Sequence, residues 1–195
     1  LTYATQWLGE EASLLDGVLS GKNKFAAKLK RAKRPMIIIG MGALVRSDGA
    51  SVLGKARQIA ETYGVVTDKW NGFNILHNAA ARVAGLDMGF VPDRGGMDIA
   101  AMAAAAKAGS LDVLWSLGAD GIDYTDFASS FVIYQGHHGD TGAHHADIVL
   151  PGAAYTEKDG IYLNTEGRVQ YANRAAFPPG EARDDWAIIR AISGA

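Results

Sequence analysis

The sequence predicts an α/β protein with a doubly wound, mostly parallel sheet, followed by a hairpin-like excursion and a final helix. Two observations carry this prediction. Short, continuous apolar runs, typical of strands buried on both faces, alternate with longer segments of helical periodicity. An order in which strands alternate with helices requires parallel crossovers, which are right-handed in nearly all proteins.

The elements are expected in three successive parts. Residues 1–34 read as a helical lead-in, because apolar residues recur at helical spacing in two stretches that a glycine separates. Residues 35–152 form the parallel α/β core, which opens with the continuous apolar run PMIII. In chain order, the expected elements of these two parts are helices 8–19 and 22–33, strand 36–39, helix 49–63, strand 65–67, helices 74–83 and 98–108, and strands 112–117, 131–134 and 148–150.

The remaining residues, 153–195, have a different pattern. The stretch GIYLNTEGRVQYAN alternates around a polar centre that contains glycine, which predicts a β-hairpin. Pro178, Pro179 and Gly180 end this stretch, and residues 181–192 follow as an amphipathic helix. We expect residues 1–195 to be a single domain fragment. Because residue 1 is Leu, we expect a piece of something larger or a processed chain.

Composition excludes several classes of function. The net charge of −2 gives no field that would attract nucleic acid, so no nucleic-acid partner is expected. The absence of cysteine excludes disulfides, thiol nucleophiles and cysteine-ligated iron–sulfur clusters within these residues. No apolar run approaches the roughly 20 residues of a membrane span, so no direct span is expected.

The turn GMGALV after the first strand is a candidate phosphate site. Gly40 and Gly42 would let the backbone approach a phosphate, and Asp68 would bind a ribose. Val45 replaces the third glycine of the dinucleotide pattern, and Asp68 lies further along than the pattern expects. A tight strand-to-helix turn is therefore favoured, with NAD or another phosphate ligand left open.

The carboxyl ends of the strands form a second candidate, because ligands of open α/β sheets bind there. Three glycine-rich turns follow strands: GMG, GADG and GHHGDTG. They permit close approach of backbone to a flat or phosphorylated ligand, and they equally suit ordinary tight turns. The residues of this candidate crevice are Gly40, Gly42, Gly118, Asp120, His137, His138 and Asp140.

Residues 134–152 hold four of the five histidines, in the adjacent pairs His137–His138 and His144–His145. Adjacent side chains diverge, so each pair offers a metal one ligand at most, with Asp140 and Asp147 as further candidates. Neither a helical His spacing nor a zincin motif is present. We therefore assign no metal ligand and no catalytic residue. A polar loop at the edge of the sheet is favoured.

The turn NTEGR is a further candidate. Asn164 and the glycine that follows Glu166 tolerate the dihedral angles of a tight turn, and Glu166 and Arg168 are placed to pair across it. The residues alone indicate a structural turn.

Residues 134–170, YQGHHGDTGAHHADIVLPGAAYTEKDGIYLNTEGRVQ, with PPGEARDDWAIIRAIS after them, resemble the large iron–sulfur subunit of respiratory complex I. The stretches LTYATQWLGEE, KRPMIIIGMGALVRSDGA and NILHNAAARVAGLDMGF extend the resemblance over essentially the whole chain. The part from ADIVLPG to GRVQ also resembles molybdopterin oxidoreductases. His144 and His145 depart from the pattern expected in the complex I branch.

The resemblance implies a molybdopterin oxidoreductase-like fold that descends from a molybdenum enzyme. In the wider family, polar residues at the strand ends and around the NTEGR turn help to hold a pterin-guanine dinucleotide. The complex I branch is taken to lack this cofactor, so the crevice, with Asn164, Glu166 and Arg168, is expected to be vestigial. The iron–sulfur clusters of that large subunit belong to an N-terminal part absent from this sequence.

The resemblance also implies partners and a location. The partners would be the N-terminal iron–sulfur part of the same subunit and other subunits of the peripheral arm. The location would be peripheral, on the cytoplasmic face of a bacterial inner membrane or the matrix side in mitochondria. The expected role is structural support of electron transfer from NADH to quinone. The alternatives are a molybdopterin- or nucleotide-binding domain, and a dehydrogenase that uses Gly40, Gly42 and Asp68.

Overall fold

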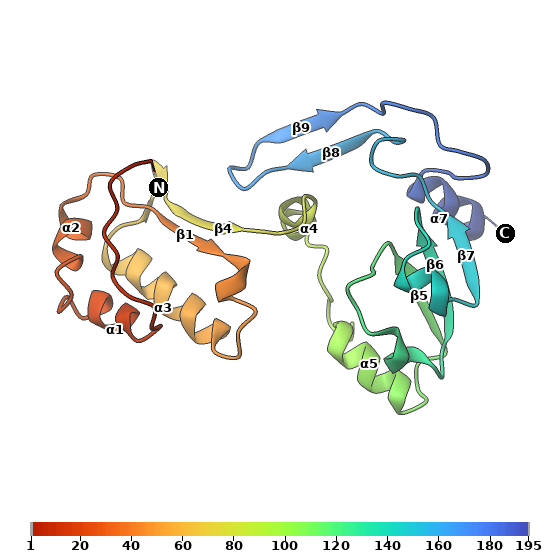
Figure 1. The fold of residues 1–195 in the computed structure, drawn as a ribbon, viewed down its shortest axis with the longest axis horizontal. Coiled ribbons are helices and arrows are strands. Elements are labelled where there is room, and N and C mark those ends of the chain that lie inside the picture. The colour runs from red at the N-terminus through yellow and green to blue at the C-terminus, as the bar shows by residue number, and fades with distance from the viewer. Residues whose placement is uncertain (1, 195) are drawn as a thin grey trace. The chain divides into compact units, whose positions relative to one another are not determined.

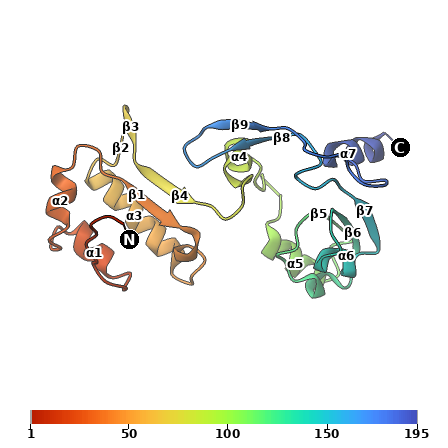
Figure 2. The same cartoon turned by 45° about the horizontal axis from the view of Figure 1, so that its top comes forward.

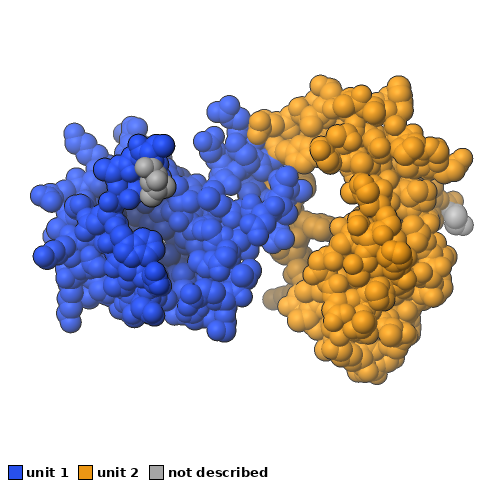
Figure 3. All heavy atoms as spheres, viewed as in Figure 1, with its two compact units in different colours: residues 1–83, 163–168 blue, residues 84–162, 169–195 orange. Residues whose placement is uncertain are grey.

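The computed structural model describes residues 2–194, which form two compact units (Figure 3). The first unit contains the residues up to Val83 together with Leu163–Arg168, and the second contains Ala84–Tyr162 and the residues from Val169 onward. These boundaries differ from those of the three expected parts. Whether the chain behaves as a single domain stays a prediction.

The first unit is a small parallel sheet with helices (Figure 1). Strand β1 pairs in parallel with β4, from Ile37 opposite Phe73 to Gly40 opposite Leu76. Ala56 and Ile59 of α3 are buried. Its elements are α1 (Leu14–Leu19), α2 (Ala26–Arg31), β1 (Ile37–Gly40), η1 (Met41–Ala43), α3 (Gly49–Thr62), β2 (Val66–Thr67), β3 (Trp70–Asn71) and β4 (Phe73–Leu76).

Two sequence expectations are wrong in this unit. Residues 73–76 form strand β4 rather than the start of a helix over 74–83, and the next helix, α4, is Arg82–Asp87. The apolar residues of this stretch fit a helical period, but parallel pairing with β1 satisfies the backbone of residues 73–76 and overrides that local pattern. Residues 66–67 pair with β3 in an antiparallel hairpin instead of joining the parallel sheet.

The second unit is built on a three-stranded parallel sheet of order β5-β6-β7 (Figure 1). The register places Leu114 opposite Val132, and Tyr134 opposite Val149. The tail adds the predicted hairpin and final helix. The elements are α5 (Ile99–Lys107), β5 (Val113–Leu117), η2 (Tyr124–Phe127), β6 (Phe131–Gly136), α6 (Thr141–His145), β7 (Ile148–Pro151), β8 (Gly160–Leu163), β9 (Val169–Ala172) and α7 (Asp185–Ser193).

One face of this sheet carries the core of the second unit. Alternate strand residues point to the same face, and on one face those of β5 and β6 pack with residues of α5, η2 and α6. Figure 2 shows α5 and α6 beside these strands. The buried cluster contains Ala106, Leu114, Tyr124, Phe127, Val132 and Tyr134. The predicted α/β class with parallel sheets is therefore confirmed.

Among residues 2–194, no helix combines the length and the apolar character needed to cross a membrane.

Replacing Gly142 with alanine is expected to destabilise the second unit. A Cβ atom at this position would overlap the ring of Tyr134, and the crowded core residue would have to move. Such overpacking typically raises the free energy of the folded state by about 1–3 kcal/mol. Urea unfolding measures the change. Gly139→Ala is the matched control, because a Cβ atom there meets nothing within 4 Å. Equal stabilities of the two variants would contradict the close packing at residue 142.

Candidate functional site

A cleft lies at the carboxyl ends of β6 and β7, within the second unit. Its volume is about 500 Å³, and it is open to solvent. Glycine backbone, small apolar side chains and the pair His137–His138 form most of its wall. Its lining residues are Gly136, His137, His138, Gly139, Ala143, Val149, Pro151, Gly152, Ala154, Glu157, Pro179 and Ala182.

Asp120 joins the segments that surround the strand ends. One carboxylate oxygen accepts a hydrogen bond from the hydroxyl of Tyr134 at 2.7 Å. The other oxygen accepts from the backbone N–H of Gly142 in α6 at 3.0 Å. The loop after β5, strand β6 and helix α6 are thus held by one side chain. Gly118 begins this loop with φ +56°, and its N–H donates to the carbonyl of Gln135 at 2.7 Å.

Tyr134 is fixed as a donor by its surroundings. Burial raises the pKa of its hydroxyl far above the ordinary value, and the hydrogen bond to Asp120 raises the pKa further. The hydroxyl therefore keeps its proton at neutral pH and donates it to Asp120.

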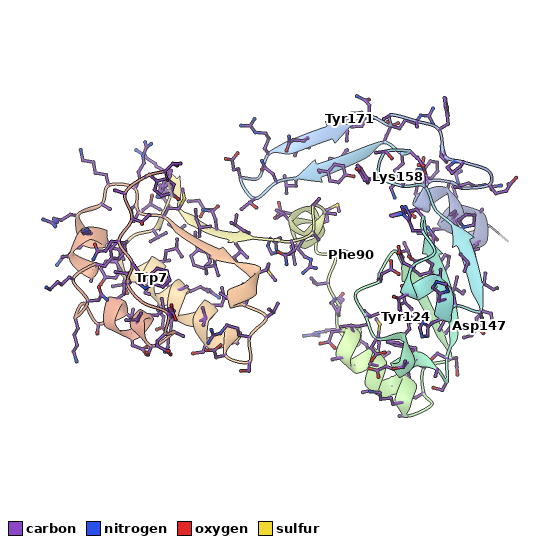
Figure 4. All side chains as sticks on the ribbon, in the orientation of Figure 1. Trp7, Phe90, Tyr124, Asp147, Lys158 and Tyr171 are labelled. Carbon is purple, nitrogen blue, oxygen red and sulfur yellow. The ribbon has the colours of Figure 1, made fainter. Side chains whose placement is uncertain are left out.

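Tyr124, which is labelled in Figure 4, belongs to the same buried cluster as Tyr134 and makes a second polar contact there. Its hydroxyl donates to the carbonyl of Ala119 at 2.9 Å, so the hydroxyl of Ser116, 2.6 Å away, donates to the Tyr124 oxygen. Burial raises the pKa of Tyr124, and the Ser116 hydrogen bond opposes that rise. His145 stacks on the ring of Tyr124 with centroids 5.8 Å apart. This histidine is exposed and contacts the core cluster through the Tyr124 ring.

Asp185, the first residue of α7, anchors the tail to the end of β6. Its backbone oxygen and its side-chain Oδ1 accept hydrogen bonds from Nε2 of the fully buried Gln135, at 3.2 and 3.0 Å. Its Oδ2 forms an ion pair with Lys158, which is labelled in Figure 4. Burial pushes the pKa of Asp185 upward, but the hydrogen bonds from Lys158 and Gln135 outweigh it and lower the pKa.

His137 and His138 line the cleft, and their rings meet edge to face, with Nδ1 atoms in contact. Asp140 occupies the N-cap position of α6, without a side-chain hydrogen bond to that helix. Asp147 lies at the other end of the sheet, where its carboxylate accepts from the N–H of Val132 at 2.7 Å. Within residues 2–194, no group of three or more His, Asp and Glu side chains is arranged to hold a metal ion.

The NTEGR turn is held by its asparagine. Oδ1 of Asn164 accepts from the N–H of Glu166 at 3.0 Å and of Arg168 at 2.9 Å. Gly167 adopts φ +79°. The side chains of Glu166 and Arg168 are exposed, and the structure records no ion pair between these two described residues. The turn is thus held by hydrogen bonds within itself, and its structural role stays a prediction.

The glycine turn after β1 lacks the geometry of a dinucleotide site. Gly40 ends β1, and Gly42 lies in the 3₁₀ turn η1, so helix α3 begins only at Gly49. Asp68 lies in the turn of the β2–β3 hairpin rather than at the end of a parallel strand. The dehydrogenase alternative therefore has no support in the fold.

The residues of the predicted crevice are divided between the two units. Gly118, Asp120, His137, His138 and Asp140 come together at the strand ends of the second unit, whereas Gly40, Gly42 and the residues of the NTEGR turn belong to the first. The sequence missed Tyr134, Gln135, Lys158 and Asp185. A tyrosine and a glutamine at the end of a buried apolar strand were the available signal, because buried polar groups need partners.

A parallel α/β fold with a glycine-lined cleft at its strand ends is typical of the class of α/β proteins that bind ligands at this edge of the sheet. The family model for molybdopterin oxidoreductase matches residues 1–195, and the chain belongs to that family.

Two individual relatives show more specifically which proteins the chain is similar to. The chain is 43% identical over 192 residues to the G subunit of NADH-quinone oxidoreductase from Rickettsia bellii (strain RML369-C), and covers 27% of that protein. It is 42% identical over 193 residues to the NADH-ubiquinone oxidoreductase 75 kDa subunit of Reclinomonas americana, again covering 27%. These matches include 98–99% of the chain. The predicted resemblance is confirmed, and the chain spans about a quarter of the length of these relatives.

The side chains that line the cleft supply no positive charge for the diphosphate of the pterin-guanine dinucleotide that the wider family holds. A diphosphate group needs cationic side chains or free backbone N–H groups. Among the described residues that line the cleft, Glu157 is the one with a full charge, and that charge is negative. The nearby cation, Lys158, is already paired with Asp185. We therefore derive no chemistry through this cofactor.

Replacing Asp120 with alanine is expected to lower the free energy of unfolding by about 1–3 kcal/mol, because it leaves the Tyr134 hydroxyl and the Gly142 N–H without their acceptor. Chemical denaturation checks this. Asp123→Ala is the control, because Asp123 accepts only from the N–H and hydroxyl of Thr125 in its own turn. A loss no larger for Asp120→Ala than for this control would contradict the anchoring role.

The Lys158–Asp185 pair predicts a pH dependence. Because the pKa of Asp185 is lowered in the folded chain, the pair stabilises the fold above the unfolded pKa of about 3.9 and loses this effect as the pH falls through the folded value. Lys158→Met should therefore lower the free energy of unfolding near neutral pH, by at most about 1 kcal/mol for this partly exposed pair. The difference should shrink in acid. When Asp185 is already replaced by Asn, the effect of Lys158→Met on the free energy of unfolding should not change with pH. If this effect still changed with pH, the pH dependence would belong to a group other than Asp185.

Proposed function

We propose that this chain is a structural part of the large iron–sulfur subunit of an NADH-quinone oxidoreductase, the respiratory complex I. It supports electron transfer from NADH to quinone without carrying a redox centre itself. The observation that carries the proposal is that acidic side chains at the strand ends form hydrogen bonds and an ion pair with other residues of the chain. Asp120 and Asp185 are held by internal partners, so they serve the fold rather than a substrate.

Composition supports the same role. The chain has no cysteine with which to ligate an iron–sulfur cluster. In the proposed assembly, the clusters belong to an N-terminal region of the longer polypeptide. The relatives that this chain resembles carry the name of NADH-quinone or NADH-ubiquinone oxidoreductase subunits and are about four times as long.

The proposed partners follow from this assignment. They are the cluster-bearing part of the same subunit and the neighbouring subunits of the peripheral arm. The proposed location is peripheral, on the cytoplasmic face of a bacterial inner membrane or on the matrix side in mitochondria.

The alternative is a molybdopterin- or nucleotide-binding domain. One observation favours it, namely a cleft of about 500 Å³ with three glycines in its wall, at the sheet edge where α/β proteins bind ligands. Its lining lacks the positive charge that a dinucleotide would need, so we place it second.

The intact subunit, purified within its complex, provides the test. Metal analysis and pterin fluorescence are expected to show neither molybdenum nor pterin in stoichiometric amount. The double variant His137→Ala/His138→Ala is expected to keep NADH:quinone activity, because these side chains line a cleft without chemistry. Asp120→Ala, which weakens the fold, should instead reduce the amount of assembled complex. Stoichiometric molybdenum or pterin, or loss of activity at normal assembly in the histidine variant, would sink the structural assignment.

A further inference from the structure

A run of basic residues in the first unit has no part in the observations that carry the proposed function. It covers residues 22–34, which include helix α2, and we call it the cationic segment. Seven of the 19 Lys and Arg residues of the chain lie in it, and no Asp or Glu occurs between Asp16 and Asp48. The seven are all exposed: Lys22, Lys24, Lys28, Lys30, Arg31, Lys33 and Arg34. The segment therefore concentrates positive charge on one stretch of the first unit.

This charge is not neutralised by ion pairs within the part of the chain that the structure describes. The ion pairs recorded among residues 2–194 involve none of the seven cations. Where the structure gives these cations a partner, that partner is uncharged. Nζ of Lys28 donates to Oε1 of Gln6 at 2.5 Å, and the guanidinium of Arg34 lies over the ring of Trp70, 5.6 Å from its centroid. Both contacts hold a side chain in place and leave its charge available to a partner.

The first unit as a whole is basic, which the net charge of the chain conceals. The unit contains 13 Lys and Arg residues against 7 Asp and Glu residues, a net charge of +6, whereas the whole chain carries −2. A concentrated charge of one sign speeds association with an oppositely charged surface and disfavours surfaces of the same sign. The cationic segment therefore fits an anionic partner.

The apolar residues of the segment indicate which class of anionic partner it fits. A basic helix that binds a lipid surface inserts an apolar face between the headgroups. Here Ala26 is buried and both Phe25 and Leu29 are half-buried, so the large apolar side chains of the segment are turned inward. Single-stranded nucleic acid needs exposed aromatic rings for stacking, and Phe25 is the one aromatic residue of the segment. An acidic protein surface requires neither feature.

We propose that the cationic segment binds an acidic surface of a neighbouring subunit of the same complex. This inference rests on the proposed function, which places the chain among the subunits of the peripheral arm. A separate subunit arrives by diffusion, so attraction between charges speeds its docking and selects its orientation. Parts of one polypeptide are already joined and associate chiefly by burying apolar area, which this segment does not offer.

Carbodiimide cross-linking of the purified complex tests the partner, because the reagent joins a lysine amine to a carboxylate that already contacts it. Mass spectrometry is expected to find Lys28 and Lys30 linked to Asp or Glu residues of another subunit. The pair Lys55–Asp16, at 2.8 Å, is the internal control and should be linked within the chain. Links from Lys28 and Lys30 only to their own polypeptide overturn the inference. So does the absence of any link from them while the control pair is linked.

Charge reversal tests the same contact by a second measurement. The full-length subunit with Lys28→Glu/Lys30→Glu is expected to join the remaining subunits roughly tenfold more slowly at low ionic strength. This difference should vanish near 1 M salt, where the screening length falls to about 3 Å. Lys69→Glu/Arg82→Glu is the matched control, because it reverses two exposed cations of the same unit outside the segment. Equal rates for the two variants, or a difference that salt does not change, would contradict the inference.

The two proposals fail separately. Stoichiometric molybdenum would overturn the structural role and leave the cross-links of the cationic segment unchanged. Links from Lys28 and Lys30 to their own polypeptide would overturn the present inference and leave the metal analysis unchanged. If the charge-reversed subunit fails to accumulate, cross-linking of the unaltered complex still decides the question.

Discussion

The hydrogen bonds of Asp120 are the constraint on which the second unit depends. A single carboxylate receives the hydroxyl of Tyr134 and the N–H of Gly142, and so joins the loop after β5 to β6 and α6. Tyr134 is buried among the core residues, which makes the loss of its acceptor costly. The positions of His137 and His138 at the edge of the cleft follow from this anchoring, because they lie on the segment between β6 and α6.

The sequence predicted the strands of the second unit well, because continuous apolar runs such as VLWSL permit few other structures. It failed at residues 73–76, where the apolar spacing suits a helix and only pairing with the distant β1 selects a strand. It also missed α6, whose five residues are too few to show a period. The hairpin and final helix were predicted from a polar turn and an apolar stripe, both of which are local signals.

The sequence indicated where the candidate site lies, but it did not indicate which residues contact one another there. The rule that ligands bind at strand ends leads directly to GADG and GHHGD, and the cleft is lined by the second of these. The partners of Asp120 and Asp185 could not be found from spacing, since Gln135 and Asp185 are 50 positions apart. These partners bear directly on function. A carboxylate that is bonded to internal partners stabilises the fold, whereas one without such partners is free to act on a ligand.

The β8–β9 hairpin ends in a turn that is ordered by its own atoms. The side chain of Asn164 accepts hydrogen bonds from two backbone N–H groups, and Gly167 adopts the left-handed backbone conformation that the turn requires. A loop that is fixed before it meets a partner loses little conformational entropy on association. The exposed Glu166 and Arg168 therefore lie on an ordered turn. A partner that contacts these two side chains must match the shape and charge that the turn already has, because the loop does not rearrange to fit it.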